Sequence, residues 1–226
     1  MRSSTPRRRT IGRPRLDAGI DVRGRLLDAA VTLFAAQGIA ATTGTQIARH
    51  AGITPAMVHY YFKGRARLLD AVVSERLLRT VNAVWAPVLD QGEDAPAMVR
   101  DLARRIVKAH REQPWLASLW LREIVSEGGQ LRQRLLSALP LPYLRHFIAA
   151  VGAAQRRHRV NARLEPRLVF MSVIALTLLP LATVRHWGRL PPLRGIGDDE
   201  IARHAEALLL EGLSVPGAAR GHAACK

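Results

Sequence analysis

The sequence predicts an all-α protein with a small N-terminal helix-turn-helix unit of three helices and a larger helical C-terminal part. Three observations support this fold class. Apolar residues recur at helical spacing along most of the chain, capping residues and prolines separate these stretches, and the alternation typical of strands is scarce. The length of 226 residues leaves room for one further core beyond a helix-turn-helix.

Four segments are expected along the chain. Residues 1–20 form a basic arm, residues 21–69 the helix-turn-helix unit, residues 70–214 the C-terminal unit and residues 215–226 a tail. The arm and the tail are rich in Arg, Gly, Pro and Ala and lack long apolar stretches, so both are expected to be disordered. The arm also lacks an apolar run of the length found in export signals.

The first two helices are marked by their ends. Residues 23–37 are amphipathic and stop before Gly38. Thr43 and Gln46 have the spacing of a capping box, in which each side chain accepts the backbone N–H of the other residue. Gly52 should end this second helix, because a positive φ is expected there.

A third, short helix is predicted over residues 55–62, with Thr54 as its N-cap and a proline at its first position. One face carries apolar residues that can pack inward. The other face has small residues at its start and polar rings farther along: Pro55, Ala56, His59 and Tyr60. A short helix of this kind fits the major groove of DNA. A helical hairpin with exposed rings is the alternative.

Residues 23–69 also carry a long pattern without insertions: Arg25, Leu27, Ala29-Ala30, Leu33-Phe34, Gly38, Thr42-Thr43, Ile47-Ala48, Ala51-Gly52-Ile53, Val58-His59-Tyr60-Tyr61-Phe62, Arg65 and Leu68. In this pattern the chain resembles the tetracycline-repressor (TetR) family of bacterial regulators. His59 stands where the family often has Tyr, and Arg65 where it usually has Lys. Gly44 and Thr45 replace larger polar residues, which puts in doubt how much base reading the second helix contributes.

The resemblance implies two sets of DNA-contacting residues. The helix starts would anchor phosphates, through Thr43, Thr54, Tyr61 and Arg65. Base contacts would come from Thr45, Pro55, Ala56, Met57, His59 and Tyr60. Phosphate contacts hold position and base contacts specify sequence, so mutations in the two sets should differ in effect.

The net charge of +16 fits a polyanion partner and salt-dependent binding. Six arginines and no acid lie in the first sixteen residues: Arg2, Arg7, Arg8, Arg9, Arg13 and Arg15. Gly12-Arg13-Pro14-Arg15 is similar to the core of an AT-hook, in which Arg13 and Arg15 would enter a narrow minor groove. A solvated, non-specific basic tail is the alternative.

The C-terminal part is expected to contain further helices over residues 65–89, 95–112, 114–127, 130–157, 166–187 and 198–213, with Pro140 and Pro142 interrupting the fourth of these. Residues 168–184 are uncharged, which raises the alternative of a membrane span. The resemblance implies instead that the last two helices form a four-helix bundle in a homodimer. The proposed interface residues are Ile174, Leu178, Leu208 and Leu209, and no membrane is expected.

The resemblance further implies a small-molecule effector bound in the C-terminal part. Trp115, Trp120, Phe147 and Met171 could line an apolar cavity, with Arg122 in a charged pair beside it. The alternative is that the aromatic residues are ordinary core and Arg122-Glu123 a surface or structural ion pair.

The chain lacks a pattern expected of catalysis, metal binding or a cofactor. Its one cysteine, Cys225, lies in the tail, and the histidines are scattered. We therefore expect a cytoplasmic, nucleoid-associated homodimer that binds double-stranded DNA at a palindromic operator and is released by a small molecule. A ligand-independent architectural DNA-binding protein and a helical enzyme carrying a helix-turn-helix are the alternatives.

Overall fold

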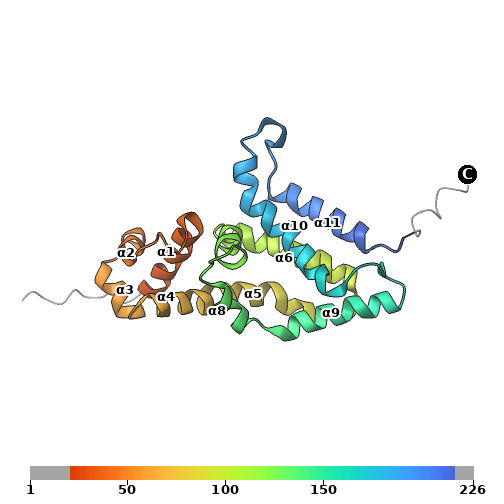
Figure 1. Ribbon diagram of the computed structural model, residues 1–226, viewed down its shortest axis with the longest axis horizontal. Coiled ribbons are helices and arrows are strands. Elements are labelled where there is room, and N and C mark those ends of the chain that lie inside the picture. Colours follow the sequence, from red (N-terminus) through yellow and green to blue (C-terminus); the bar gives the residue numbers. More distant parts are fainter. Residues whose placement is uncertain (1–20, 217–226) are drawn as a thin grey trace, which may run out of the picture.

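The computed structural model describes residues 21–216, and every regular element within that range is a helix (Figure 1). Three helices at one end of the molecule form the N-terminal unit: α1 (Val22–Gln37), α2 (Gly44–Ala51) and α3 (Pro55–Phe62). They enclose a common core, because α2 and α3 direct Ile47, Ala51 and Phe62 toward the buried side of α1.

The ends of these helices follow from local chemistry. The predicted capping box at α2 is confirmed, with both reciprocal bonds between Thr43 and Gln46 in place. Gly52 adopts the expected left-handed conformation with φ 67°. Thr54 holds the N-cap position of α3, but its hydroxyl makes no capping hydrogen bond. The predicted side-chain cap at Thr54 is therefore wrong, and Pro55 alone favours the helix start.

A long helical segment joins the two units. It begins with α4 (Arg65–Val72), continues through a π-helical turn η1 (Val73–Leu77) into α5 (Leu78–Trp85), and ends in a 3₁₀ turn η2 (Ala86–Gln91). The sequence predicted one helix over residues 65–89 and did not anticipate the π turn. A π turn inserts one extra residue and changes the direction of the side chains that follow it.

The C-terminal unit contains the remaining helices, in the order α6 (Ala95–Glu112), α7 (Leu116–Trp120), the π-helical turn η3 (Leu121–Val125), α8 (Arg132–Ala138), α9 (Leu141–Arg156), α10 (Pro166–Trp187), the 3₁₀ turn η4 (Pro191–Leu193) and α11 (Asp198–Leu213). The predicted proline break is confirmed, since α8 and α9 meet at a bend of 73°. Helix α6 packs against both α10 and α11.

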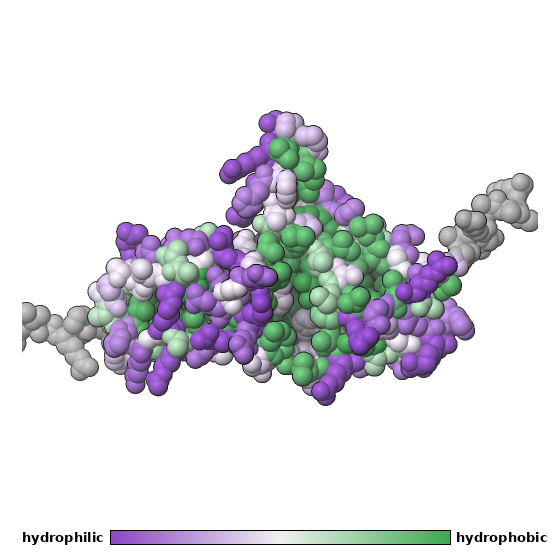
Figure 2. Space-filling model, viewed as in Figure 1, coloured by the Kyte–Doolittle hydropathy of each residue, from purple (hydrophilic) through white to green (hydrophobic). Residues whose placement is uncertain are grey.

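Helix α10 is both long and apolar. It is the one helix in the described chain that is long and apolar enough to cross a membrane by length and composition alone, and a third (33%) of its most apolar window is buried. One side packs on α6, α9 and α11. Leu168, Met171 and Leu179 remain exposed, and Figure 2 shows hydrophobic residues gathered in the middle of this face.

One of the histidines in residues 21–216 is buried. His110 on α6 is 8% exposed, and its Nδ1 makes no hydrogen bond within residues 21–216. Burial lowers the pKa of His110, Asp198 acts in the opposite direction, and Arg185 lowers that pKa further. The folded state therefore resists protonation of this ring.

We expect the stability of the folded protein to decrease as pH falls below about 6.5, because of His110. The unfolded ring takes up a proton near its ordinary pKa of about 6.5, whereas the folded ring does so only at a lower pH. Stability from this group is therefore complete above about pH 6.5 and is lost as pH falls below it. Urea unfolding at pH 7.5, 6.5 and 5.5 should show a shallower loss for His110→Leu than for the parent. The exposed His50→Leu variant is the control, and equal losses in parent and His110→Leu would contradict the assignment.

Candidate DNA-binding surface and apolar groove

The outer face of α3 is exposed, while its inner face is packed. Val58 and Tyr61 are half-buried against the core and Phe62 is fully buried. The residues predicted to touch bases are exposed, with Met57 half-buried: Thr45, Pro55, Ala56, His59 and Tyr60. The Tyr60 side chain has 67% of its surface exposed, so its ring can extend toward a partner.

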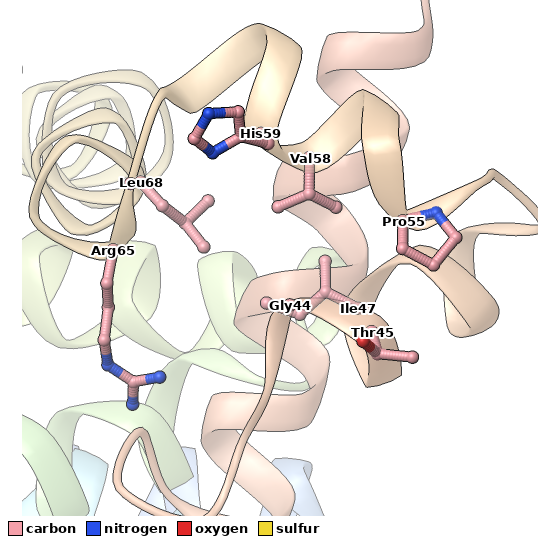
Figure 3. A pocket seen from close by; sticks show the side chains of 9 residues that line it. Gly44, Thr45, Ile47, Pro55, Val58, His59, Arg65 and Leu68 are labelled. Carbon is pink, nitrogen blue, oxygen red and sulfur yellow. The ribbon is translucent and has the colours of Figure 1, made fainter.

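A shallow hollow of about 280 Å³ lies between α2, α3 and the start of α4 (Figure 3). It brings four predicted DNA-contacting residues together, with Thr45 and Pro55 on one side and His59 and Arg65 on the other. Ile47, Val58 and Leu68 form its floor. Predicted base-contacting and phosphate-contacting residues therefore share one face of the unit.

Arg65 has a second set of partners that the sequence did not reveal. Its guanidinium donates to the carbonyl of Thr42 at 2.8 Å and to the carbonyl of Ile39. These bonds tie the start of α4 to the loop between α1 and α2. The phosphate-anchoring role of Arg65 stays a prediction, and the structure adds this role within the protein.

The other predicted anchors lie around the same face. Thr43 and Thr54 are exposed, and Tyr61 is half-buried, with its ring edge-on to that of Tyr60 at 5.2 Å between centroids. The Thr43 hydroxyl already accepts the backbone N–H of Gln46 at 3.2 Å. Arg13 and Arg15 of the basic arm lie outside the described residues.

Two exposed cations near this surface were missed by the sequence reading. Arg49 lies in the last turn of α2, and Lys63 follows α3 in the left-handed conformation. Neither forms an ion pair within residues 21–216. Both residues lie at helix ends next to α3, and this position in the sequence could have identified them.

A groove of about 350 Å³ runs between α7–η3 and α10. Its lining side chains are aliphatic or aromatic: Trp120, Leu121, Ile124, Val125, Phe170, Met171, Ile174, Ala175, Leu178 and Leu179. A smaller space of about 40 Å³ lies beside it, and both spaces are lined by Trp120, Ile174 and Leu178. None of the residues lining either space carries an ionisable group.

Of the five predicted effector residues, the groove contains only Trp120 and Met171. Phe147 is fully buried, with its ring 5.9 Å from that of Trp85. Trp115 lies in a separate, polar hollow beside α1. Arg122 points to the N-terminal unit, where its Nη2 lies 3.5 Å from the Ala36 carbonyl. The single cavity predicted from these residues is therefore wrong, because Phe147 packs in the core against Trp85 while Trp115 and Arg122 lie toward the N-terminal unit.

The predicted dimer residues also separate. Leu178 and Leu209 are each 7% exposed and belong to the core of their own subunit, so their assignment to a partner-facing surface is wrong. The apolar stripe of α11 faces inward through Ile201, Ala205 and Leu209. Leu208 is exposed at 49%, and Ile174 lines the groove.

Two buried hydroxyl groups in residues 21–216 are satisfied by hydrogen bonds within the fold. The Thr80 hydroxyl donates to Gln113 at 2.7 Å, and that of Thr177 to the Val173 carbonyl at 2.7 Å. Within the same range no group of three or more His, Cys, Asp or Glu side chains could hold a metal ion.

Comparison of the sequence with known proteins identifies similarity to bacterial transcriptional regulators. Residues 26–72 match the sequence model of the family described as bacterial regulatory proteins, tetR family. The chain is 43% identical over 157 residues to the HTH-type transcriptional regulator SrpR of Pseudomonas putida, a match that covers 68% of this chain and 72% of SrpR. It is 34% identical over 154 residues to the probable HTH-type transcriptional regulator YttP of Bacillus subtilis (strain 168), covering 57% of this chain and 72% of YttP.

Solved structures share the fold at low sequence identity. The transcriptional regulator FadR from Bacillus subtilis, in complex with stearoyl-CoA, superposes with a TM-score of 0.65 at 17% identity, covering 84% of this chain and 99% of FadR. The ketosteroid transcriptional regulator KstR2 of Mycobacterium tuberculosis gives a TM-score of 0.67 at 18% identity, covering 85% of this chain and 94% of KstR2.

Proposed function

This chain belongs to the TetR family of bacterial transcriptional regulators, and on that premise we propose that it is a homodimeric repressor released from a palindromic operator by an apolar small molecule. It acts in the cytoplasm, on the chromosome. The observation that carries the DNA-binding part is the exposed outer face of α3, which shares one surface with Thr45 and Arg65.

Two recognition helices in a dimer would enter successive major grooves about 34–36 Å apart, or at a multiple of that spacing. The test is selection of bound duplexes from random sequence, followed by footprinting of the enriched site. A protected site with two-fold symmetry is expected. A protected site without that symmetry would contradict the proposed operator.

The groove beside α10 is the proposed effector site. Its lining offers no charge and no hydrogen-bonding side chain apart from the Trp120 indole, so it fits an apolar ligand or the apolar part of a larger one. The structural relative FadR was solved in complex with stearoyl-CoA, a ligand with a long apolar chain, which supports this proposal. We propose the same chemical class of ligand here, without a preferred head group.

The exposed face of α10 supports the dimer. Leu168 and Trp187 of α10 are 55% and 57% exposed, and large apolar side chains along one helix are normally covered by a partner surface. A second copy seated on this face would form a bundle from α10 and α11 of both subunits.

We expect Met171→Gln to weaken ligand binding. Met171 lines the groove, so an unpaired amide there must lose water when a ligand enters. The test ligands are fatty acids, acyl-CoA thioesters and steroids. The Met171→Gln protein should need about tenfold more of an active ligand than the parent to release the operator. Leu89→Gln is the control, because Leu89 is 45% exposed but lies in η2, outside the groove. An equal shift for both variants would place the ligand elsewhere.

We expect Tyr60→Ala and Arg65→Ala to differ in kind. Tyr60→Ala should change the order of preference among operator variants, because the ring projects from the recognition face. Arg65→Ala should weaken all sequences alike and reduce the slope of log affinity against log salt by about one. Titrations at several salt concentrations distinguish the two. An unchanged slope for Arg65→Ala would contradict a phosphate contact. The role of Arg65 would then be limited to its hydrogen bonds with Ile39 and Thr42.

A further inference from the structure

A buried carboxylate joins the two units of the chain. Glu123, in the π turn η3, is 5% exposed. Its Oε1 accepts the backbone N–H of Ile39 at 2.9 Å, and its Oε2 accepts the backbone N–H of Gln130 at 3.0 Å. We propose that Glu123 is a positioning residue that conveys occupancy of the apolar groove to the helix-turn-helix through Ile39. This inference rests on the proposed effector role of the groove.

The groove side of this connection is the π turn itself. Leu121, Ile124 and Val125 of η3 form one wall of the groove, while Glu123, in the same turn, binds Ile39. The backbone of Glu123 is also closely packed, because a Cβ on Gly129 would lie 2.3 Å from the Glu123 carbonyl oxygen. A ligand that displaces this wall must therefore move the carboxylate with it.

The DNA side of the connection is a network of hydrogen bonds within the loop that precedes α2. The Ile39 carbonyl accepts from Arg65 at the start of α4, and the same guanidinium holds Thr42. The Thr42 hydroxyl donates to the Gly38 carbonyl at 2.7 Å. The Gln37 amide donates to that hydroxyl at 3.2 Å and lies 3.5 Å from Gln46, which caps α2. A shift of Ile39 therefore reaches the first turns of both α2 and α4.

The chemistry of the site requires a carboxylate. Both of its partners are N–H donors, and a carboxylate presents an acceptor oxygen to each. A glutamine has the same shape but offers one oxygen and one NH₂ group. In Glu123→Gln one of the two N–H groups must face another donor, so the connection is weakened without a change in side-chain volume.

The test fills the groove without knowledge of the natural effector. The chain has one cysteine, Cys225, so a Cys225→Ser, Met171→Cys protein can be modified at position 171 with N-phenylmaleimide. Intact mass gives the extent of modification, and sedimentation checks that modified and unmodified proteins have the same oligomeric state. The same modification of Leu89→Cys is the control, because Leu89 is 45% exposed and lies in η2, outside the groove.

Operator affinity is then measured with and without the adduct in three backgrounds: Glu123, Glu123→Gln and Glu127→Gln. Glu127 is an exposed carboxylate just after η3, without a bonding partner among the described residues, so its variant matches the loss of charge. With Glu123 or Glu127→Gln the adduct should weaken operator binding at least about fivefold. With Glu123→Gln the change should stay below about twofold.

The outcomes separate the two proposals. An adduct at position 171 that leaves operator affinity unchanged in the Glu123 protein would overturn the effector role of the groove and this inference with it. An equal weakening with Glu123 and Glu123→Gln would overturn the role of Glu123 alone.

Hydrogen exchange covers the case in which Glu123→Gln fails to fold. In the Glu123 protein, the adduct at position 171 should speed exchange of the peptide that contains the Ile39 N–H, while the peptide containing the Leu208 N–H keeps its rate. Unchanged exchange at Ile39 would overturn the inference.

Discussion

We expect Leu208→Arg to convert the protein from a dimer to a monomer at micromolar concentration and to lower operator affinity at least about 100-fold. Leu208 is exposed at 49% in the single subunit, so the arginine is tolerated there. In a two-fold symmetric dimer the change occurs twice, and each unpaired charge costs several kcal/mol when it loses water. Since about 1.4 kcal/mol is a tenfold change, two such charges suffice to prevent association.

Leu89→Arg is the matched control for this experiment. Leu89 lies in η2, away from α10 and α11, and is 45% exposed. The two variants therefore add the same charge at similarly exposed leucines. Sedimentation should show a monomer for Leu208→Arg and a dimer for Leu89→Arg. A Leu208→Arg protein that remains dimeric would exclude this part of α11 from the interface.

We expect Ala56→Glu to abolish measurable operator binding, with a loss of at least about 100-fold. Ala56 is exposed in the first turn of α3, where the proposed pose brings the helix into a groove flanked by phosphates. A carboxylate there meets like charge, which costs several kcal/mol at each half-site. The fold should be unaffected, because acidic residues are favourable in the first turn of a helix.

Ala56→Gln separates charge from size in this experiment. Glutamine and glutamate have nearly the same volume, so a purely steric effect would weaken both variants alike. We expect Ala56→Gln to lose much less affinity than Ala56→Glu, and the difference to shrink as salt rises. Equal losses that do not depend on salt would mean that α3 approaches another surface.

Helix ends were predictable from sequence because their causes are local. Thr43 and Gln46 are three residues apart and satisfy each other, and Gly52 supplies a conformation that other residues adopt at a cost. The bend between α8 and α9 follows from Pro140 and Pro142 in the same way. The prediction that the apolar residues of α3 pack inward was also correct, because helical spacing determines which side chains share one face of a helix.

The side of a helix that meets a partner was not predictable, because it depends on packing between distant segments. Leu178 and Leu209 have the same apolar character as Leu179 and Leu208, yet the first two are buried in their own subunit. Glu123 was expected to lie at the surface or to pair with Arg122. Its actual partner, Ile39, is 84 residues away and bonds through its backbone, which leaves no mark in the sequence.

The bond between Glu123 and Ile39 bears on the exchange of modules between regulators. A DNA-binding unit cut from this chain and fused to a foreign effector unit would carry the buried N–H of Ile39 into a new interface. Without an acceptor at the equivalent place, that group would cost about 1–3 kcal/mol. A hybrid sensor built from this chain must therefore keep the η3 turn together with α1–α3. The boundary for such engineering is set by this hydrogen bond and not by the residue at which the N-terminal unit ends in the sequence.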